Sequence, residues 1–204
     1  MKISLKKSIL FSGLILIVLF LFNVFWSTGF FRTIENKFEG EIFKQIKLKG
    51  AEDITVSHID SFAIISSTAR KSFPNIEQEG GGLYFLDLKN KNFKLIHLTN
   101  NFKKPFAPHG ISIFKKNNCY IIAAINHTLD GEFIEIFKLT GTKLTHQKSL
   151  KHKLIFSPND IVLLDENKVY VTNDHKYRKG LNRVAEDYLG LSLSNVIYFD
   201  GMRF

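Results

Sequence analysis

The apolar positions of the chain follow two patterns, and the first is a continuous stretch near the amino terminus. From Ser8 to Phe31 there are 24 residues without a charged side chain. A helix of that length covers about 36 Å, whereas the hydrocarbon core of a bilayer is about 30 Å thick. The stretch therefore predicts one transmembrane helix, and we assign residues 1–31 to the lysines before it and a transmembrane signal anchor.

Positive charges before this helix predict its orientation. Lys2, Lys6 and Lys7 precede it, and no acidic residue occurs before Glu35. Because Lys and Arg are retained on the cytoplasmic side, we expect a single-pass protein with a cytoplasmic amino terminus. The remainder would be exported to the periplasmic or extracellular side, and Trp26 suits an aromatic anchor at the far interface.

A cleaved signal peptide is the alternative interpretation, because it would share the lysines and the apolar core. Its cleavage site needs small residues, and Val24-Phe25-Trp26 offers large ones. We therefore favour an uncleaved anchor. A lipoprotein is excluded because no Cys follows the apolar stretch, and the uninterrupted apolarity argues against the buried helix of a soluble protein.

The second pattern follows a polar linker, residues 32–49, and consists of short apolar runs separated by turn residues. The runs are rich in Val, Ile, Phe and Tyr, and joints such as Gly80-Gly81-Gly82 separate them. Such runs are typical of strands and hairpins. We expect an all-β region over residues 50–204 with a short helix from Arg183 to Leu191. The predicted strands include Phe62 to Ile65, Leu83 to Leu88, Phe93 to Leu98, Tyr120 to Ile125, Phe133 to Leu139, Ile161 to Leu164 and Val169 to Thr172.

A motif recurs along these runs. Gly50 to Ile54 resembles Pro108 to Ser112 and Pro158 to Val162, and each copy is followed by an apolar strand that ends in a polar cluster. A further strand follows each cluster. Repeats of several strands at intervals of about 40 to 55 residues are typical of β-propeller blades. We therefore predict a β-propeller rather than a β-sandwich with coincidental similarity.

The repeats do not add up to a closed propeller. They span about residues 50–98 and 108–150, and a third begins at about residue 158 and reaches only its third strand. A propeller must close, because open sheets leave unpaired edges. We expect about three blades, belonging to a fragment, to a truncated gene product or to one partner of a complex.

Charge and cysteine content exclude several classes of protein. Lys and Arg number 28 against 19 Asp and Glu, which gives a formal net charge of +9. The basic residues are scattered, apart from pairs such as Lys103-Lys104 and a run from Lys176 to Lys179. They form no stripe or basic helix, which argues against nucleic-acid binding. The single Cys119 excludes an intrachain disulfide and a thiolate metal cluster.

The repeat places polar residues at the start of each inner strand. Glu52, His109 and Asn159 occupy equivalent positions, and Asp53 and Asp160 follow two of them directly. The inner strands of a propeller line its channel, so these side chains should converge at its mouth. Carboxylate and amide oxygens are ligands that Ca²⁺ prefers. Alone, each pair would be an ordinary surface acidic pair or turn; their registered repetition predicts a calcium site.

Together these motifs resemble the serum paraoxonase/arylesterase family, whose members are six-bladed propellers that hydrolyse lactones and aryl esters with two calcium ions in the channel. Members also keep an uncleaved signal sequence as an anchor. The resemblance covers about Gly50 to Phe199. Its motifs are Gly-x-Glu-Asp at Gly50 to Asp53, Pro-His-Gly-Ile-Ser at Pro108 to Ser112, Asn126-His127, Asn-Asp-Ile-Val at Asn159 to Val162, Thr-Asn-Asp-His at Thr172 to His175, and Tyr-Leu-Gly-Leu at Tyr188 to Leu191.

The resemblance implies a role for each of the repeated polar residues. Glu52 and Asn159 correspond to ligands of the catalytic calcium ion. Asp53, Asp160 and the backbone carbonyl of Ile111 correspond to ligands of the structural ion. Calcium of this kind polarises an ester or lactone carbonyl and stabilises the oxyanion that develops.

It also implies a histidine dyad. His109 would be the base for an attacking water molecule, and His127 would orient it. His175 matches the family pattern as well, but only as a residue that braces the channel. The formal glycosylation sequon Asn126-His127-Thr128 lies beside a predicted channel residue, so we expect it to be unused.

Two functions of different classes remain open at this point. The first is a membrane-anchored, calcium-dependent lactonase or arylesterase acting on small-molecule substrates. The second is a non-catalytic membrane-tethered propeller fragment, or a strictosidine-synthase-like propeller with other chemistry. His109 and His127 favour the first. The family's other catalytic-calcium ligands lie in blades beyond residue 204, so we expect the chain as given to be inactive or nearly so. The family's disulfide has no counterpart here.

Overall fold

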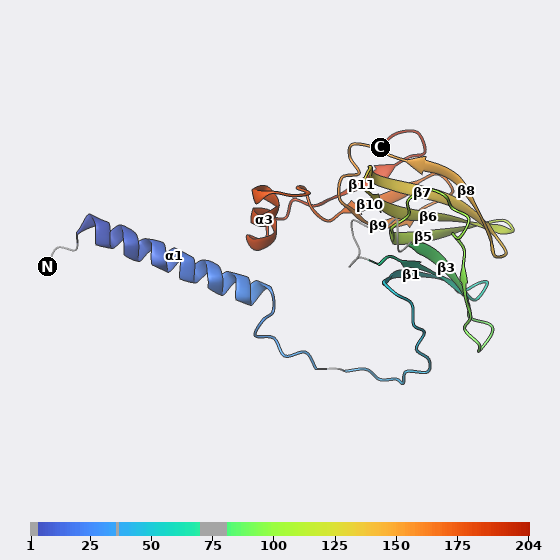
Figure 1. Ribbon diagram of the computed structural model, residues 1–204, viewed down its shortest axis with the longest axis horizontal. Helices are drawn as coiled ribbons and strands as arrows, with labels where there is room; N and C mark the ends of the chain where they lie inside the picture. The colour runs from blue at the N-terminus through green and yellow to red at the C-terminus, as the bar shows by residue number, and fades with distance from the viewer. Residues whose placement is uncertain (1–3, 36, 70–80) are drawn as a thin grey trace.

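A computed structural model of the chain describes residues 4–35, 37–69 and 81–204; Lys2 and Gly80, named above, lie outside these ranges. The apolar stretch forms helix α1 (Leu5–Ser27), and none of its residues is buried. An extended segment joins α1 to the sheets, and Figure 1 shows the helix well apart from them. The predicted apolar helix is confirmed, and it is long and apolar enough to cross a membrane.

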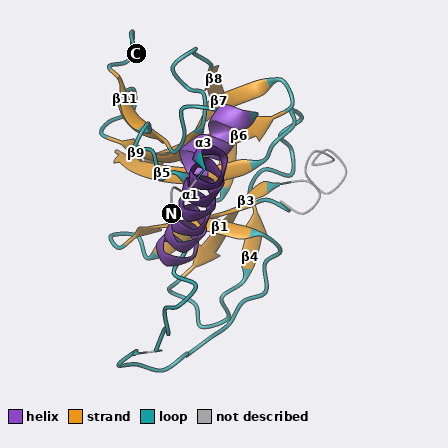
Figure 2. Cartoon of the chain, turned by 90° about the vertical axis from the view of Figure 1, so that its left-hand side faces the viewer, coloured by secondary structure: helices purple, strands orange, loops and turns teal. Residues whose placement is uncertain are grey.

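The rest of the described chain is built from antiparallel sheets in which sequential strands are neighbours (Figure 2). The first sheet contains β1 (Ala51–Ser57), β2 (Phe62–Ser67), β3 (Gly82–Asp87) and β4 (Leu95–His97). The second contains β5 (Pro108–Lys116), β6 (Cys119–Thr128), β7 (Gly131–Thr140) and β8 (Lys143–Leu150). The third contains β9 (Pro158–Leu163), β10 (Val169–Asn173) and β11 (Asn195–Phe199).

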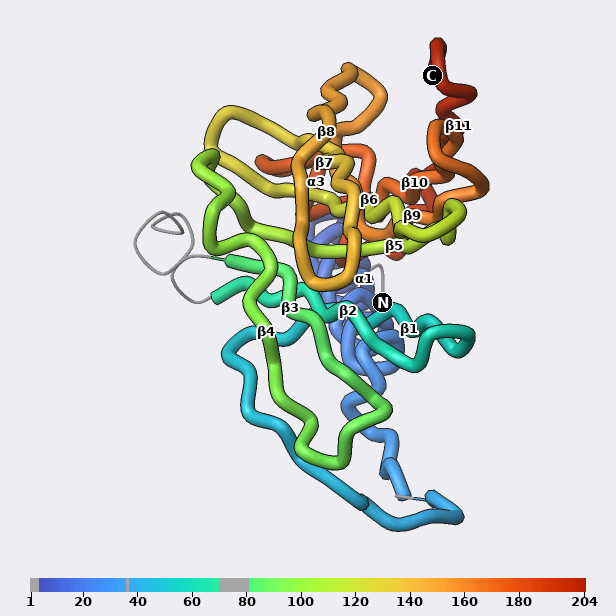
Figure 3. The backbone as a smooth tube through the Cα atoms, turned by 90° about the vertical axis from the view of Figure 1, so that its right-hand side faces the viewer, coloured from blue at the N-terminus to red at the C-terminus, as the bar shows by residue number. Residues whose placement is uncertain are grey.

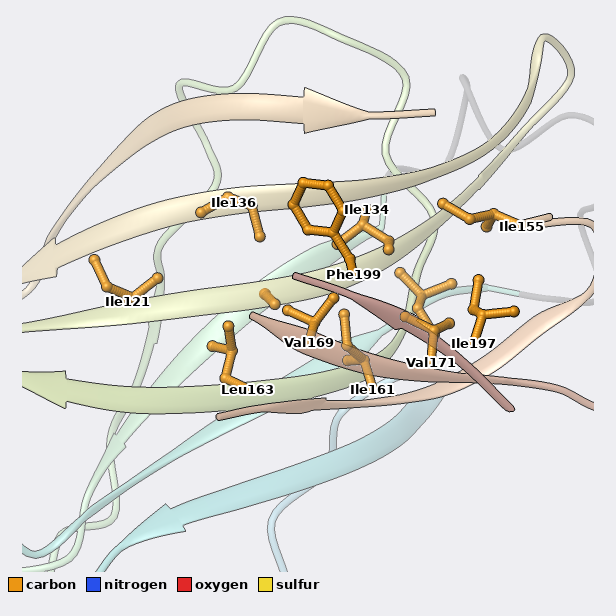
Figure 4. Close-up of a cluster of buried hydrophobic side chains, with 12 residues drawn as sticks. Ile121, Ile134, Ile136, Ile155, Ile161, Leu163, Val169, Val171, Ile197 and Phe199 are labelled. Atoms are coloured by element: carbon orange, nitrogen blue, oxygen red, sulfur yellow. The ribbon is translucent and has the colours of Figure 1, made fainter. Parts of the chain in front are cut away.

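These three sheets coincide with the three predicted repeats, and their order is consistent with a partial propeller. The second sheet packs between the other two, as the tube in Figure 3 shows. One buried cluster fills the space between the second and third sheets. Figure 4 shows it formed by isoleucines of β6 and β7 on one side and by apolar side chains of β9, β10 and β11 on the other.

Strand β6 shows why the central part of the middle sheet has an almost continuously apolar sequence. Alternate residues of a strand point to opposite faces. Ile121 and Ile125 therefore pack toward the third sheet, whereas Tyr120 and Ile122 pack toward the first. Both faces are buried, so polar residues have no exposed face to occupy along the centre of this strand.

The predicted strands are confirmed, with two differences at the sheet edges. Strand β4 is shorter than the predicted Phe93 to Leu98, because Phe93 has a φ of +47° and lies in the turn before the strand. Strand β8 was not among the predicted runs. It is an outer strand whose Lys143 and Lys148 interrupt any apolar run, as is common at exposed sheet edges.

The predicted helix from Arg183 to Leu191 is confirmed with different bounds. Helix α3 spans Leu181–Tyr188. Its end is set by Gly190, which adopts a φ of +63°, and the N–H of Leu191 bonds to the carbonyl of Glu186. A left-handed glycine with this bond is a common helix stop, so the helix cannot continue to Leu191.

A polar network ties the first sheet to the second at the ends of their strands. The Asp60 carboxylate accepts hydrogen bonds from Lys115 Nζ at 2.8 Å and from Tyr120 Oη at 2.5 Å. Lys115 contributes most to holding the pKa of Asp60 below its usual 3.8, and Tyr120 adds to this effect. Tyr120 Oη also lies 2.5 Å from Ser57 Oγ.

We expect Asp60→Asn to lower the free energy of unfolding at pH 7. The folded-state pKa of Asp60 is depressed, so its contribution is present above pH 3.8 and is lost as the pH falls through the folded-state value. The difference between variant and wild type should therefore shrink as the pH falls below 3.8. Urea unfolding followed by circular dichroism, at pH 7 and at a series of lower pH values, measures it. A difference that stays constant would contradict a role for the charge of Asp60.

Candidate active site

Each sheet has an irregularity at the start of its innermost strand. Strand pairing shifts register between Ala51 and Ile54 in β1, between Pro108 and Ile111 in β5, and at the corresponding place in β9. The shifted positions hold Glu52-Asp53, His109-Gly110 and Asn159-Asp160. A β-bulge redirects the side chains it carries. The bulges are therefore the local reason that the predicted polar residues leave the regular strand pattern.

The first and third bulges also have the same pattern of hydrogen bonds. The N–H of Asp53 donates to Ser66 Oγ at 3.1 Å, and the N–H of Asp160 donates to Thr172 Oγ1 at 3.0 Å. Each aspartate Oδ1 also accepts the N–H of the next residue at 2.7 Å. The repeat found in the sequence is thus a repeat of backbone geometry.

The bulges of neighbouring sheets lie close together because β5 packs between β1 and β9 (Figures 1 and 2). Gly110 permits the closest approach: a Cβ atom there would lie 2.5 Å from the Asn159 carbonyl oxygen and 3.0 Å from Asp160 Oδ1. On the other side, Asp53 Oδ2 accepts the N–H of Ile111 at 2.8 Å. Asp53 and Asp160 therefore flank the same two residues of β5.

Asp53, Asp160 and Ile111, three of the predicted calcium ligands, lie close to one another at this place. The N–H and C=O of a strand residue point to the same side. The N–H of Ile111 points at Asp53, so its carbonyl also faces the side of β5 that carries Asp53. The carboxylates of Asp53 and Asp160 and this carbonyl are oxygen ligands of the kind that Ca²⁺ takes. Within the described residues, no cluster of three or more His, Cys, Asp and Glu side chains is arranged to hold a metal, so a calcium site here would need amide and backbone oxygens as well.

The two predicted histidines are in direct contact. His109 Nδ1 lies 3.1 Å from His127 Nε2. On its other side, His109 Nε2 lies 3.2 Å from Glu52 Oε1. Both rings are largely buried, with 15% of the His109 side chain and 29% of the His127 side chain exposed. The structure therefore brings Glu52, His109 and His127 together in one chain of contacts.

Two further residues extend this chain, and the sequence reasoning missed both. Glu132 Oε2 lies 2.5 Å from His127 Nδ1, and Glu132 Oε1 accepts a hydrogen bond from Arg178. Glu132 is 8% exposed. The sequence feature that could have indicated Glu132 is the tight turn after Thr128. This turn sets the register of the β6–β7 hairpin, in which Glu132 pairs with His127. Arg178 comes from the loop after β10, and no sequence signal placed it here.

A cavity of about 380 Å³ opens beside the two histidines. His109, His127 and Glu132 line it, together with Asp174 and Arg178. The cavity combines potential proton acceptors with apolar wall atoms, so a small organic molecule could lie against the histidine pair.

Two asparagines hold the loops that form this cavity. Asn126 Oδ1 accepts the N–H of Ala107 at 2.8 Å, and Asn173 Oδ1 accepts the N–H of Ser157 at 3.0 Å. These are equivalent positions in the second and third sheets. Asn126 is 1% exposed, so the folded chain leaves no room for a glycan on this side chain.

His175 braces the loop next to the cavity. Its Nε2 lies 3.3 Å from Asp174 Oδ2 and 2.6 Å from Arg183 Nη2, and its Nδ1 lies 3.4 Å from Asp187 Oδ1. These contacts connect the end of β10 to helix α3. His175 is not among the described residues that line the cavity.

Taken together, the fold and the site define a mostly β-sheet protein with an apolar N-terminal helix, in which repeated bulges bring a histidine pair close to carboxylate and amide side chains. Comparisons with known proteins give its family. The arylesterase family model matches residues 33–203, and the chain belongs to this family.

Curated relatives agree with this assignment. The chain is 31% identical over 160 residues to serum paraoxonase/arylesterase 2 of Gallus gallus, and 32% identical over 157 residues to serum paraoxonase/lactonase 3 of Homo sapiens. It is 33% identical over 162 residues to serum paraoxonase/arylesterase 1 of Mus musculus. Each match covers 74% of this chain and 44% of the relative, so the chain spans less than half the length of these relatives.

Proposed function

We propose that this protein is a membrane-anchored, calcium-dependent hydrolase of lactones and aryl esters, and that its sheets are blades of a β-propeller. The hydrogen bond between His109 and His127 at 3.1 Å, at the edge of the cavity and next to Glu52, carries the proposal. Relatives named as arylesterases and lactonases support the same type of chemistry.

The histidine pair supplies the proton transfer. His109 directs Nε2 toward Glu52 and Nδ1 toward His127. We assign Nε2 as the atom that takes a proton from the attacking water molecule. The Nδ1–H of His109 donates to His127 Nε2, which holds the ring in this orientation. Histidine suits this task because its ordinary pKa lies near neutral pH.

Side chains at the bulges would hold calcium. Glu52 and Asn159 are the proposed ligands of the catalytic ion, and Asp53, Asp160 and the Ile111 carbonyl are those of the structural ion. When bound, calcium supplies a positive charge that polarises the substrate carbonyl. Asn159 is also oriented by its own neighbour, because its Nδ2 donates to Asp174 Oδ2 at 3.4 Å.

Helix α1 would anchor the protein in the membrane. Its 23 residues bury nothing in the fold, and Lys6 and Lys7 lie at its amino-terminal end. Positive residues at this end favour a cytoplasmic amino terminus and exported sheets. The site would then face the periplasmic or extracellular side, where calcium is available to it.

Hydrolysis assays on membranes test the function. The protein, expressed from its complete coding sequence, should hydrolyse an aryl acetate or an aliphatic lactone. Activity should disappear with a calcium chelator and return when Ca²⁺ is restored, whereas Mg²⁺ should not replace it because it demands a tighter octahedral site. Hydrolysis that persists with the chelator would contradict the calcium-dependent mechanism, and the absence of hydrolysis of either class would contradict the function.

A further inference from the structure

His127 is held at both of its ring nitrogens. Its Nε2 lies 3.1 Å from His109 Nδ1, and its Nδ1 lies 2.5 Å from Glu132 Oε2. The Glu132 side chain is 8% exposed, and its other oxygen is bonded to Arg178. Each carboxylate oxygen of Glu132 therefore has a partner of its own, which fixes the plane of the carboxylate as well as its position.

The β6–β7 hairpin delivers Glu132 to this place. His127 and Glu132 are paired across the hairpin, and Thr128 Oγ1 donates to the Gly131 carbonyl at 2.9 Å to close the turn. Paired residues of adjacent strands present their side chains on the same face. The contact between Glu132 and His127 is therefore built into the register of the second sheet.

Arg178 contacts Glu132 from a loop that follows a strand of the third sheet, whereas Glu132 belongs to the second sheet. It lies in the loop between β10 and α3, and buried Glu186 of α3 organises this loop by accepting the N–H groups of Lys176 at 2.8 Å and Tyr177 at 3.0 Å. Burial raises the pKa of Glu186, but the two backbone hydrogen bonds and the electrostatic attraction of His175 and Arg183 together leave the pKa below its usual value. Glu186 is thus a charged acceptor that orders the residues directly before Arg178.

The chemistry of the three groups sets the protonation pattern of the histidines. An ionised carboxylate only accepts hydrogen bonds, so His127 Nδ1 must carry a proton to bond with Glu132. In neutral His127, Nε2 is then the acceptor. It must then receive its hydrogen bond from His109 Nδ1–H. The tautomer of His127 follows from the position of one carboxylate.

We propose that Glu132 is a positioning residue that selects the His127 tautomer, and that Arg178 clamps Glu132 for this purpose. Glu132 acts through His127, whose Nε2 then accepts from the Nδ1–H of His109 and orients the His109 ring. A catalytic role for this effect rests on the proposed function, whereas the tautomer itself is a property of the folded chain.

Nitrogen NMR tests the tautomer without any need for activity. The protein, expressed from its complete coding sequence and labelled with ¹⁵N-histidine, is studied in detergent micelles at neutral pH. We expect a protonated Nδ1 and an unprotonated Nε2 for wild-type His127. Glu132→Ala should lose this preference and give a mixture of tautomers, whereas Glu132→Gln keeps an acceptor oxygen and should restore part of it. An unchanged His127 signal in Glu132→Ala would overturn the proposal.

A matched ion pair provides the control. Glu166 bonds to Lys116 and, like Glu132, connects the second sheet to the third, but it lies outside the cavity that the histidines line. Glu166→Gln should leave the His127 signal unchanged. Arg178→Met should broaden or shift this signal while Glu132 is still present. If Glu132→Ala does not fold, as judged by its thermal melt, Glu132→Gln and Arg178→Met still decide the matter, and wild-type signals in both would overturn the proposal.

Kinetics then tests the catalytic consequence. Glu132→Ala should lower kcat for ester or lactone hydrolysis by about 10- to 100-fold, the usual effect of losing such an orienting partner. KM should change little, because Glu132 is proposed to act on the base and not on the substrate. An unchanged kcat would overturn the positioning role. If the wild-type protein hydrolyses neither substrate class, the proposed function fails, and the NMR result still decides the role of Glu132.

Discussion

Replacing His109 with Gln is expected to lower kcat for ester or lactone hydrolysis by about 10²- to 10⁴-fold, the range that a positioned general base contributes. Gln keeps the approximate size of the side chain and can still form a hydrogen bond with His127, but it has no basic nitrogen at the position of Nε2. The effect should appear in kcat more than in KM. Assays on the protein expressed from its complete coding sequence measure it.

His152 provides the control for this substitution. Its ring stacks on Phe204 with a centroid distance of 4.7 Å, and it is not among the described residues that line the cavity. His152→Gln should therefore keep wild-type kinetics. Calcium binding by His109→Gln should also be retained, because His109 is not a proposed ligand. A His109→Gln variant with more than half of the wild-type kcat would rule out this histidine as the base.

The two proposed calcium sites should respond differently to substitution. Asp53, Asp160 and the Ile111 carbonyl lie around one stretch of β5, and all belong to residues 1–204. Asp160→Ala deletes one of only two charged ligands there, so it should abolish calcium binding by these residues. Glu52→Ala should leave this binding largely intact, yet it should remove hydrolysis in the protein expressed from its complete coding sequence.

Calorimetry on the two variants separates these sites. Asp165→Ala is a suitable control, because Asp165 lies in the turn before β10, where its Oδ1 accepts the N–H of Asn167 at 2.8 Å. This variant should bind calcium as the wild type does. If Glu52→Ala removed binding while Asp160→Ala retained it, the assignment of the two sets of ligands would be reversed.

The sequence predicted the sheets well because their signal is local and repeated. The alternation of apolar runs and turns gave the strands, and recurrence of the bulge residues gave the equivalence of Glu52, His109 and Asn159. Strand β8 was not predicted, because an outer strand can carry polar residues on both faces. The end of α3 was misplaced because the conformation of Gly190, which stops the helix, depends on the backbone path.

The site was predictable only where its residues belong to the repeat. The bulges supplied the proposed ligands and His109, and the end of β6 supplied His127. Glu132 could be inferred only from the register of the β6–β7 hairpin. A register shift of one residue would have placed its side chain on the opposite face of the sheet, away from His127. Arg178 approaches through the loop between β10 and α3, and the course of such a loop depends on contacts such as those of Glu186. Long-range contacts of this kind leave no periodic trace in the sequence.

The bulges also bear on how such a site can change over time. The backbone keeps one geometry at the start of β1, β5 and β9, while the side chains it presents differ in charge and chemistry. A substitution at one of these positions can therefore alter reactivity without requiring a new strand arrangement. Gly110 is the exception, because the neighbouring Asn159 carbonyl leaves no space for a side chain. Backbone packing therefore restricts the residue type at position 110 more tightly than at the positions of Glu52 and Asn159.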